Sequence, residues 1–327
     1  MSHTLAVGLA QIAPVFLDRA ATLARVTALI HEAADAGCGL VCFGESLVPG
    51  YPVWLSLTHG SRFESRMQKE LHARYLKEAV QVERGDLDAV AAVAKTRRIA
   101  VYLGIVERPS DRGGHSLYCS LVFISAEGAV GSVHRKLVPT YEERLSWAAG
   151  DGHGLRTHAC GPFTVGGLNC WENWVPMARQ ALYAQGENLH VAVWPGAVRN
   201  TEDVTRFIAK ESRGYVVSVG SLLRVGDFPA DLPHRGEIVA AVADGVERPG
   251  FIADGGSCVA GPDGRWVLPP VAEREGLLTV ELDVRRVYEE RHNFDASGHY
   301  SRPDVLRLHV NRERQAVWTE EASAPDQ

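Results

Sequence analysis

Short apolar runs alternate with longer helix-forming segments along the chain, and this alternation limits the possible folds more than any other property of the sequence. Residues 5–10 and 40–43 have the length and composition of buried strands. The segment between them opens at Asp18, carries apolar residues at helical spacing and stops at Gly37, as an amphipathic helix does. Because strands that alternate with helices are typical of α/β folds, we predict an α/β protein.

The same alternation continues through the rest of the chain. We predict helices over residues 63–80, 86–94, 175–185 and 203–213, and strands over residues 99–106, 116–125, 129–134, 163–169, 189–193, 215–222, 256–261, 266–268 and 277–282. The strands 116–125 and 129–134 are joined by the turn 126–128, so they form an antiparallel pair that a purely parallel barrel would not contain. No linker or internal repeat interrupts the pattern. We expect a single domain over residues 1–312 and a flexible C-terminal tail over residues 313–327.

Charge and hydropathy exclude several classes of partner. The 327-residue chain has a formal net charge of −6, so it lacks the basic field that gathers nucleic acid or anionic lipid. No apolar stretch has the roughly 18–20 residues that span a bilayer, and the first residues lack the basic and apolar regions of a secretory signal. We expect a cytoplasmic protein that binds a small molecule and neither nucleic acid nor a membrane.

The cysteines and the common sequence signatures give no indication of a cofactor. Six cysteines are too sparse for a disulfide framework, and a reducing compartment would keep them as thiols. Cys38 and Cys42 are close in sequence but have no second pair and no nearby histidine. Glycine-rich nucleotide-binding loops, a G-x-S-x-G elbow and a complete H-E-x-x-H motif are absent from the sequence. We therefore expect no cofactor and no metal.

Three predicted strands are followed, within two residues, by Glu45, Lys136 and Cys170. Ligands of α/β proteins tend to bind beyond the carboxyl ends of strands, so these side chains could converge there. A thiol is mostly protonated at neutral pH and needs a base to become a nucleophile. Glu45 can take its proton, and Lys136 can stabilise negative charge on the attacked substrate. The set suits attack on a carbon that bears a nitrogen.

Each of these residues also has a purely structural explanation. Glu45 could be a solvated loop carboxylate, Lys136 a surface ammonium beside Arg135, and Cys170 a small packed apolar residue. The occurrence of all three, each within a short motif after a predicted strand, favours the catalytic interpretation.

These motifs resemble the nitrilase superfamily, and in particular its nitrile-hydrolysing branch. The resemblance extends from about residue 5 to residue 310, and several motifs in order are more specific than one alone. The matching stretches are FGES at 43–46, PGYP at 49–52, HRKLVPT at 134–140, NCWEN at 169–173 and GHYSRPDV at 298–305.

The resemblance implies an α-β-β-α sandwich, in which two sheets lie between layers of helices. It also implies that Glu45 is the general base, Lys136 the electrostatic stabiliser and Cys170 the nucleophile. A second glutamate that positions substrate or water falls on Glu143, seven residues beyond Lys136, and the adjacent Glu142 is the competing assignment.

One departure from the family pattern is Gly44, which stands where a proline is commoner before the glutamate. Glycine can adopt backbone conformations that proline cannot. The sequence therefore leaves the position of the Glu45 carboxylate less constrained, although not its identity.

The residues after the cysteine indicate the substrate. Trp171, followed by Glu172 and Asn173, resembles nitrilases more than the amidase and carbamoylase branches. The resemblance thus implies hydrolysis of an organic nitrile to the carboxylic acid and ammonia, without a cofactor, through a thioimidate and a thioester on Cys170. An amidase or carbamoylase, a cyanide hydratase, and a catalytically silent binding protein of the same fold are the alternatives.

Aromatic residues near the motifs are candidates for substrate contact. We expect Tyr51, Trp171 and Trp194 to line the pocket, because they adjoin motif residues or a strand end, and we count Glu172 among the substrate-binding residues. A position in the core is the alternative for each aromatic residue.

The resemblance also implies a homo-oligomer built from dimers, in the form of a spiral or filament. Residues 58–67 and 224–237 resemble the insertions that mediate such contacts. A plain surface loop is the alternative for either segment.

Overall fold

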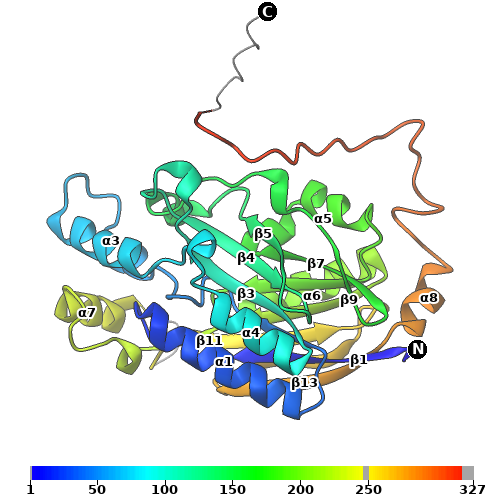
Figure 1. The fold of residues 1–327 in the computed structure, drawn as a ribbon, viewed down its shortest axis with the longest axis horizontal. Helices are drawn as coiled ribbons and strands as arrows, with labels where there is room; N and C mark the ends of the chain where they lie inside the picture. The colour runs from blue at the N-terminus through cyan, green and yellow to red at the C-terminus, as the bar shows by residue number, and fades with distance from the viewer. Residues whose placement is uncertain (1, 246–249, 319–327) are drawn as a thin grey trace, which may run out of the picture.

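The computed structural model describes residues 2–245 and 250–318, and two β-sheets form its centre (Figure 1). In the first sheet, β1, β2 and β3 are parallel, whereas β13, β4 and β5 are antiparallel to their neighbours. The antiparallel pair predicted from the sequence is β4–β5. The strand order is β13 (Gly276–Asp283), β1 (Thr4–Gln11), β2 (Leu40–Phe43), β3 (Ala100–Glu107), β4 (Tyr118–Ile124) and β5 (Val130–Arg135).

The second sheet has a similar plan. Its strands β7, β8 and β9 are parallel, and antiparallel strands flank them on both sides. The order is β10 (Leu222–Arg224), β11 (Phe251–Ala260), β9 (Tyr215–Gly220), β8 (Leu189–Trp194), β7 (Phe163–Asn169) and β6 (His158–Cys160), and β12 (Trp266–Ala272) pairs with β11.

Helices cover the outer faces of both sheets (Figure 1). The first sheet carries α1 (Arg19–Asp35) and α4 (Asp88–Arg97), and the second carries α5 (Pro176–Tyr183) and α6 (Val198–Ser212). The other helices are α2 (Trp54–Leu57), α3 (Arg66–Glu78), α7 (Arg235–Gly245) and α8 (Arg285–Arg291).

The strand β2 shows how the layers are held together. Leu40 and Cys42 face a core that also contains apolar residues of β7, β8 and β9, so this core lies between the two sheets. Val41 and Phe43 face α1 and α4 on the other side. Successive side chains of a strand point to opposite faces, and both faces of β2 are therefore buried. The predicted α-β-β-α sandwich is confirmed.

Helix boundaries follow the local capping signals. Asp18 accepts a hydrogen bond from the backbone N–H of Ala21 and caps α1, as the sequence predicts. The helix α6 begins at Val198, five residues before the predicted start. The prediction missed this start because the N-cap residue, Ala197, has no polar side chain that could signal the boundary. The predicted start at Asp203 used a charged residue that lies inside the helix.

The strand β11 begins at Phe251, five residues before the predicted strand 256–261. Gly255 and Gly256 have φ angles of 98° and 85° and coincide with an irregularity in the pairing of β11 with β12. Glycine inside a strand often marks such a bulge, whereas our prediction treated it as a strand end.

The described chain after α8, residues 292–318, forms no helix or strand and runs past α5 to the end of β5 (Figure 1). Arg314 donates hydrogen bonds to Asp151 and to the backbone oxygen of Val133 in β5. The predicted tail begins within this segment, and residues 319–327 lie outside the described chain. None of the helices in residues 2–245 and 250–318 is long and apolar enough to cross a membrane.

Candidate active site

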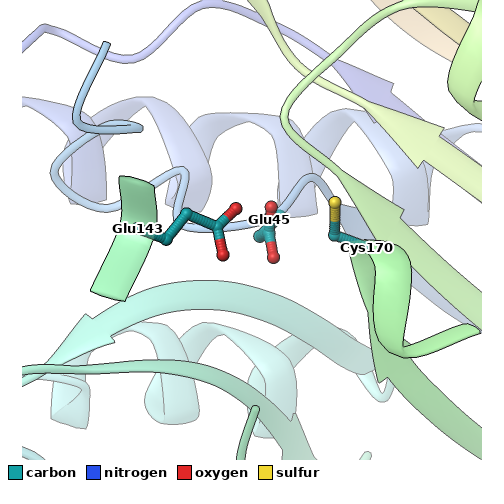
Figure 2. Close-up of side chains that lie close together, drawn as sticks. All are labelled: Glu45, Glu143 and Cys170. Carbon is teal, nitrogen blue, oxygen red and sulfur yellow. The ribbon is translucent and has the colours of Figure 1, made fainter. Parts of the chain in front are cut away.

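Glu45, Lys136 and Cys170 follow the carboxyl ends of three strands, and the fold brings them together. Glu45 lies two residues after β2 and Lys136 directly after β5 in the first sheet, whereas Cys170 directly follows β7 in the second sheet. All three side chains are buried. Polar atoms of Glu45, Glu143 and Cys170 lie within 4.8 Å of one another, and Figure 2 shows Glu45 between the other two.

The two carboxylate oxygens of Glu45 have different surroundings. Oε1 accepts hydrogen bonds from Lys136 Nζ at 2.9 Å and from the Cys119 thiol at 3.4 Å. Oε2 is buried and has no hydrogen-bond partner among the described residues. Burial raises the pKa of Glu45 to about 7, against the lowering effect of Lys136 and with a further rise from Glu143. A carboxyl group with this pKa can take and return a proton near neutral pH.

Lys136 lies between two carboxylates. Its Nζ donates to Glu45 Oε1 at 2.9 Å and to Glu143 Oε2 at 2.7 Å. Burial alone would lower the pKa of Lys136, but Glu45, Cys170 and Glu143 raise it well above its ordinary value. The side chain is therefore an ammonium ion. Two of its three protons are used in these hydrogen bonds, so a third remains to be donated.

Glu143 is held by several donors at once. Its Oε2 accepts from Lys136 Nζ and from the backbone N–H of Thr140 at 2.6 Å, and its Oε1 accepts from the Tyr51 hydroxyl at 2.8 Å. Glu143 is buried, whereas Glu142 is partly exposed and lines the cavity. Of the two glutamates, Glu143 is thus the one that contacts Lys136.

Cys170 is the first residue of the short helical turn Cys170–Trp174 and has a φ angle of 48°. This left-handed conformation is strained for a residue with a Cβ, and such strain concentrates at functional sites. Burial raises the pKa of the Cys170 thiol well above its ordinary value, and Glu45 and Glu143 add to the rise, while Lys136 and the backbone N–H of Trp171 oppose it. The resting residue is therefore a thiol, which must lose its proton to a base before it can act as a nucleophile.

A cavity of about 540 Å³ opens onto these residues. Glu45, Glu143 and Cys170 lie in its wall, together with the predicted substrate-binding residues Tyr51 and Trp171. Further apolar lining comes from Val53, Leu57, Leu222, Leu223, Val242, Phe251 and Ile252, and polar lining from Ser56, Arg199, Asn200, Ser221 and Asp254.

Residues 6–292 match the family described as "Carbon-nitrogen hydrolase". The chain belongs to the carbon-nitrogen hydrolase family.

Known members of this family resemble the chain over most of its length. It is 36% identical to "Nitrilase 2" of an unknown prokaryotic organism, over 93% of this chain and 92% of the relative. It is 32% identical to an arylacetonitrilase of Macrophomina phaseolina, over 96% of this chain and 93% of the relative. Among solved structures, a carbon-nitrogen hydrolase of Helicobacter pylori has a TM-score of 0.65 at 18% identity and covers 92% of this chain and 97% of its own.

Within this carbon-nitrogen hydrolase, the departure at Gly44 has a packing reason. A Cβ atom on Gly44 would lie 2.1 Å from Ser221 Oγ and 3.1 Å from the backbone oxygen of Trp194. The backbone N–H of Glu45 donates to the same Trp194 oxygen at 3.2 Å. Gly44 thus lets the ends of the two sheets approach closely, and Glu45 is more constrained than the sequence alone indicates.

Glu172 and Trp194 lie away from the cavity, which differs from the prediction that both contact substrate. The Glu172 carboxylate accepts hydrogen bonds from His134 Nε2 and from the backbone N–H groups of Leu137 and Asn169. Trp194 is fully buried in the core beneath α6. Glu172 therefore connects the neighbours of Lys136 and Cys170 instead of binding substrate.

Cys119 is the contact of Glu45 that the sequence analysis did not identify. It lies in β4, and its backbone oxygen accepts a hydrogen bond from the backbone N–H of Lys136. The predicted pairing of strands 116–125 and 129–134 does not identify this neighbour, because the register of β4 and β5 shifts at Phe123 and Ile124.

Glu45, Glu143 and Cys170 are also a group whose donor atoms are close enough to hold a metal ion. However, the ammonium of Lys136 lies within hydrogen-bond distance of both carboxylates. Its positive charge already pairs with both carboxylates.

Proposed function

We propose that this carbon-nitrogen hydrolase is a nitrilase, which hydrolyses an organic nitrile to the carboxylic acid and ammonia. The observation that carries the proposal is the meeting of a thiol and a carboxyl group with a free oxygen in the wall of one cavity, with a buried ammonium, Lys136, hydrogen-bonded to that carboxyl group. The names of the relatives, nitrilase and arylacetonitrilase, support a nitrile as the substrate.

The first half of the reaction forms a covalent bond to Cys170. Glu45 Oε2 takes the thiol proton, and the thiolate attacks the nitrile carbon. One π bond of the nitrile breaks as the carbon–sulfur bond forms, and the thiol proton passes through Glu45 to the nitrogen, which gives a thioimidate. Lys136 faces the nitrogen as negative charge develops there, a contribution of about 3 kcal/mol when the donor is prearranged in a dry site.

The second half uses two water molecules. The first adds to the thioimidate carbon with Glu45 as base, and ammonia leaves to give a thioester. The second attacks the thioester, releases the carboxylic acid and returns the proton to sulfur. Glu143 holds Lys136 and the Tyr51 hydroxyl in place and has no oxygen free of donors. Its role in this proposal is to position these two groups, while Glu45 moves the protons.

The test is a panel of nitriles and their matching amides, assayed with three forms of the enzyme. Wild type incubated with a panel of aliphatic, aromatic and arylaceto-nitriles should release acid and ammonia and show a mass adduct on Cys170. Cys170→Ala should release neither product, and Glu45→Gln should lose about two to four orders of magnitude in rate.

The matching amides distinguish the alternatives. Ammonia from the amide but not from the nitrile would identify an amidase, and accumulation of amide from cyanide would identify a cyanide hydratase. Absence of both turnover and a Cys170 adduct would contradict an enzymatic function.

We also propose that the enzyme is a homo-oligomer that works in the cytoplasm. A nucleophilic thiol must stay reduced, which a cytosolic environment provides. Trp174, which precedes α5, stacks on Phe207 of α6, and the nearby Met177 of α5 is exposed. Apolar patches of this kind often mark protein–protein contacts. We define Trp174, Met177 and Phe207 as the α5–α6 patch.

A further inference from the structure

Asn173 fixes the backbone of the nucleophile. Its side chain is fully buried, and Nδ2 donates to the backbone oxygen of Cys170 at 2.8 Å and to that of Leu168 at 3.3 Å. These two carbonyl contacts determine the orientation of the amide, because the opposite orientation would place Asn173 Oδ1 against two acceptors. Arg179 in turn donates to the backbone oxygen of Asn173 at 2.7 Å.

A buried histidine and glutamate lie behind Asn173. His190 Nε2 is 2.7 Å from Asn173 Oδ1, and His190 Nδ1 is 2.9 Å from Glu187 Oε1. Both side chains are buried. The site leaves room for them at Gly166, where a Cβ atom would lie 2.2 Å from Glu187 Oε1. The contacts form a continuous chain from Glu187 through His190 and Asn173 to Cys170.

The hydrogen bonds also determine the number of protons in this chain. Asn173 Oδ1 can only accept, so His190 Nε2 carries a proton. An ionised Glu187 could likewise only accept, so the second proton is either on His190 Nδ1 or on Glu187. In both cases one proton lies between Glu187 and His190 Nδ1.

The chain ends on the peptide unit that contains the next N–H. The carbonyl group of Cys170 and the N–H of Trp171 belong to the same planar peptide, so they point in opposite directions. The backbone N–H of Trp171 acts to lower the pKa of the Cys170 thiol. A donor that holds the carbonyl oxygen at one edge of the planar peptide therefore also fixes the direction of the N–H at the opposite edge, and each bond in such a chain polarises the next.

We propose that Glu187, His190 and Asn173 are positioning residues that aim the Trp171 N–H at the sulfur of Cys170. This inference rests on the proposed role of Cys170 as the nucleophile. We call this chain of hydrogen bonds from Glu187 through His190 and Asn173 the relay. The relay keeps residue 170 in its left-handed conformation and provides a fixed donor for the thiolate before attack. Its effect is on the chemical steps at sulfur, and the substrate-binding wall of the cavity does not include these three residues.

The test compares His190→Phe with His190→Gln. Phenylalanine fills the ring volume but has no donor for Asn173 Oδ1, whereas the glutamine amide nitrogen can replace Nε2. We expect His190→Phe to lower both kcat and the rate of Cys170 alkylation by iodoacetamide about 10- to 100-fold with KM little changed, since small misplacements of reacting groups have effects of this size. His190→Gln should stay within about threefold of wild type. Glu187→Gln, which can still donate to His190 Nδ1, should also retain activity.

A folded His190→Phe that matches wild type in kcat and alkylation would overturn the relay, and so would a folded His190→Gln with more than about a tenfold loss. The measurement on His190→Gln tests the relay even when His190→Phe does not fold. Alkylation, followed by mass spectrometry on Cys170 and the other five thiols, needs no nitrile turnover. Wild-type Cys170 that reacts no faster than the other thiols would contradict the proposed nucleophile, a result distinct from failure of the relay.

Discussion

At the residue scale, the unequal surroundings of the two Glu45 oxygens determine which atom can act as a base. Oε1 is occupied by Lys136 and Cys119, and Oε2 faces no partner among the described residues. An oxygen that already accepts two hydrogen bonds is a weaker base than its free neighbour. The proton from Cys170 is therefore expected on Oε2.

The pKa of Glu45 predicts the acid limb of the pH profile. Because burial raises this pKa to about 7 and the base must be ionised, kcat/KM should rise with pH through about 7 as one proton is lost. The Cys119 thiol lowers the pKa by its hydrogen bond. Cys119→Ala should thus shift the limb to higher pH, and Cys119→Ser, which keeps a donor, should not. An identical limb in Cys119→Ala and wild type would contradict this contribution.

Glu172 offers a second prediction, because it joins the two halves of the site through His134, Leu137 and Asn169. Burial acts to raise the pKa of Glu172, but these donors lower it below its ordinary value. Its ionised form thus stabilises the fold at neutral pH, and this contribution declines as the pH falls below about 4. Glu172→Gln should reduce the free energy of unfolding by about 1–3 kcal/mol.

Denaturant unfolding and steady-state kinetics test this prediction together. In Glu172→Gln, kcat should fall because Glu172 holds the residues next to Lys136 and Cys170. KM should stay nearly unchanged because Glu172 does not line the cavity. Glu127→Gln, in the exposed turn between β4 and β5, is the matched control. A large increase in KM for Glu172→Gln would instead support the substrate contact predicted from the sequence.

The sequence predicts the neighbourhood of Glu45, Lys136 and Cys170 because each follows a buried strand inside its own motif. It predicts the same role for the adjacent residues Trp171 and Glu172, but of the two only Trp171 lines the cavity. Both lie on one tight helical turn, where neighbouring side chains point in different directions, so Trp171 is half exposed at the cavity and Glu172 is buried. A sequence motif specifies the residues of a turn but not which side of it the core occupies.

At the scale of elements, the ends of β2 and β9 approach each other through Gly44. A Cβ atom there would lie 2.1 Å from Ser221 Oγ, and the backbone nitrogen of Ser221 is 3.0 Å away. The sheet ends must separate to accept any larger residue. Because Glu45 directly follows Gly44, such a separation moves the carboxylate.

Gly44→Ala should therefore reduce both stability and activity. Overpacking of this kind destabilises a fold by about 1–3 kcal/mol, and displacement of Glu45 should lower kcat. The double variant Gly44→Ala with Ser221→Ala removes the closest contact, so it should recover part of both losses. Thermal unfolding and kcat measured on the two variants and on Ser221→Ala alone check this expectation. Equal losses in the single Gly44 and double variants would contradict the packing explanation.

Elements with strong local signals are predictable, and those defined by tertiary contacts are less so. The strands β1 and β2 and the cap of α1 follow from apolar runs and from Asp18. In contrast, α7 is not among the predicted helices. It begins within residues 224–237, which resemble an insertion in the sequence. Its buried residues Ile238 and Val242 pack against a cluster that includes Trp54 and Leu71 of α2 and α3. That helix is stabilised by partners distant in sequence, and propensity is a weak guide in such a case.

At the scale of the whole molecule, the pattern of strands and helices alone does not distinguish two packed sheets from one large sheet. The family resemblance supplies that distinction, and the shared core between the sheets confirms it. The proposed assembly of several chains would use exposed apolar side chains. Met177 is 61% exposed and Phe207 50% exposed, although both are large and apolar. Burial of these side chains against a second copy would stabilise a dimer.

Paired substitutions on the α5–α6 patch test this assembly. Wild type should have the mass of a dimer or a larger assembly in light scattering. Met177→Glu combined with Phe207→Glu should shift this mass toward that of the 327-residue monomer, because two buried carboxylates per subunit would oppose association.

Phe63→Glu probes residues 58–67, where Phe63 is 90% exposed, and should leave dimers while preventing larger assemblies. Tyr288→Glu changes an exposed aromatic residue on α8 and should leave the mass unchanged. A monomeric wild type would contradict the proposed oligomer, and an unchanged mass in the patch variant would exclude the α5–α6 patch as its interface.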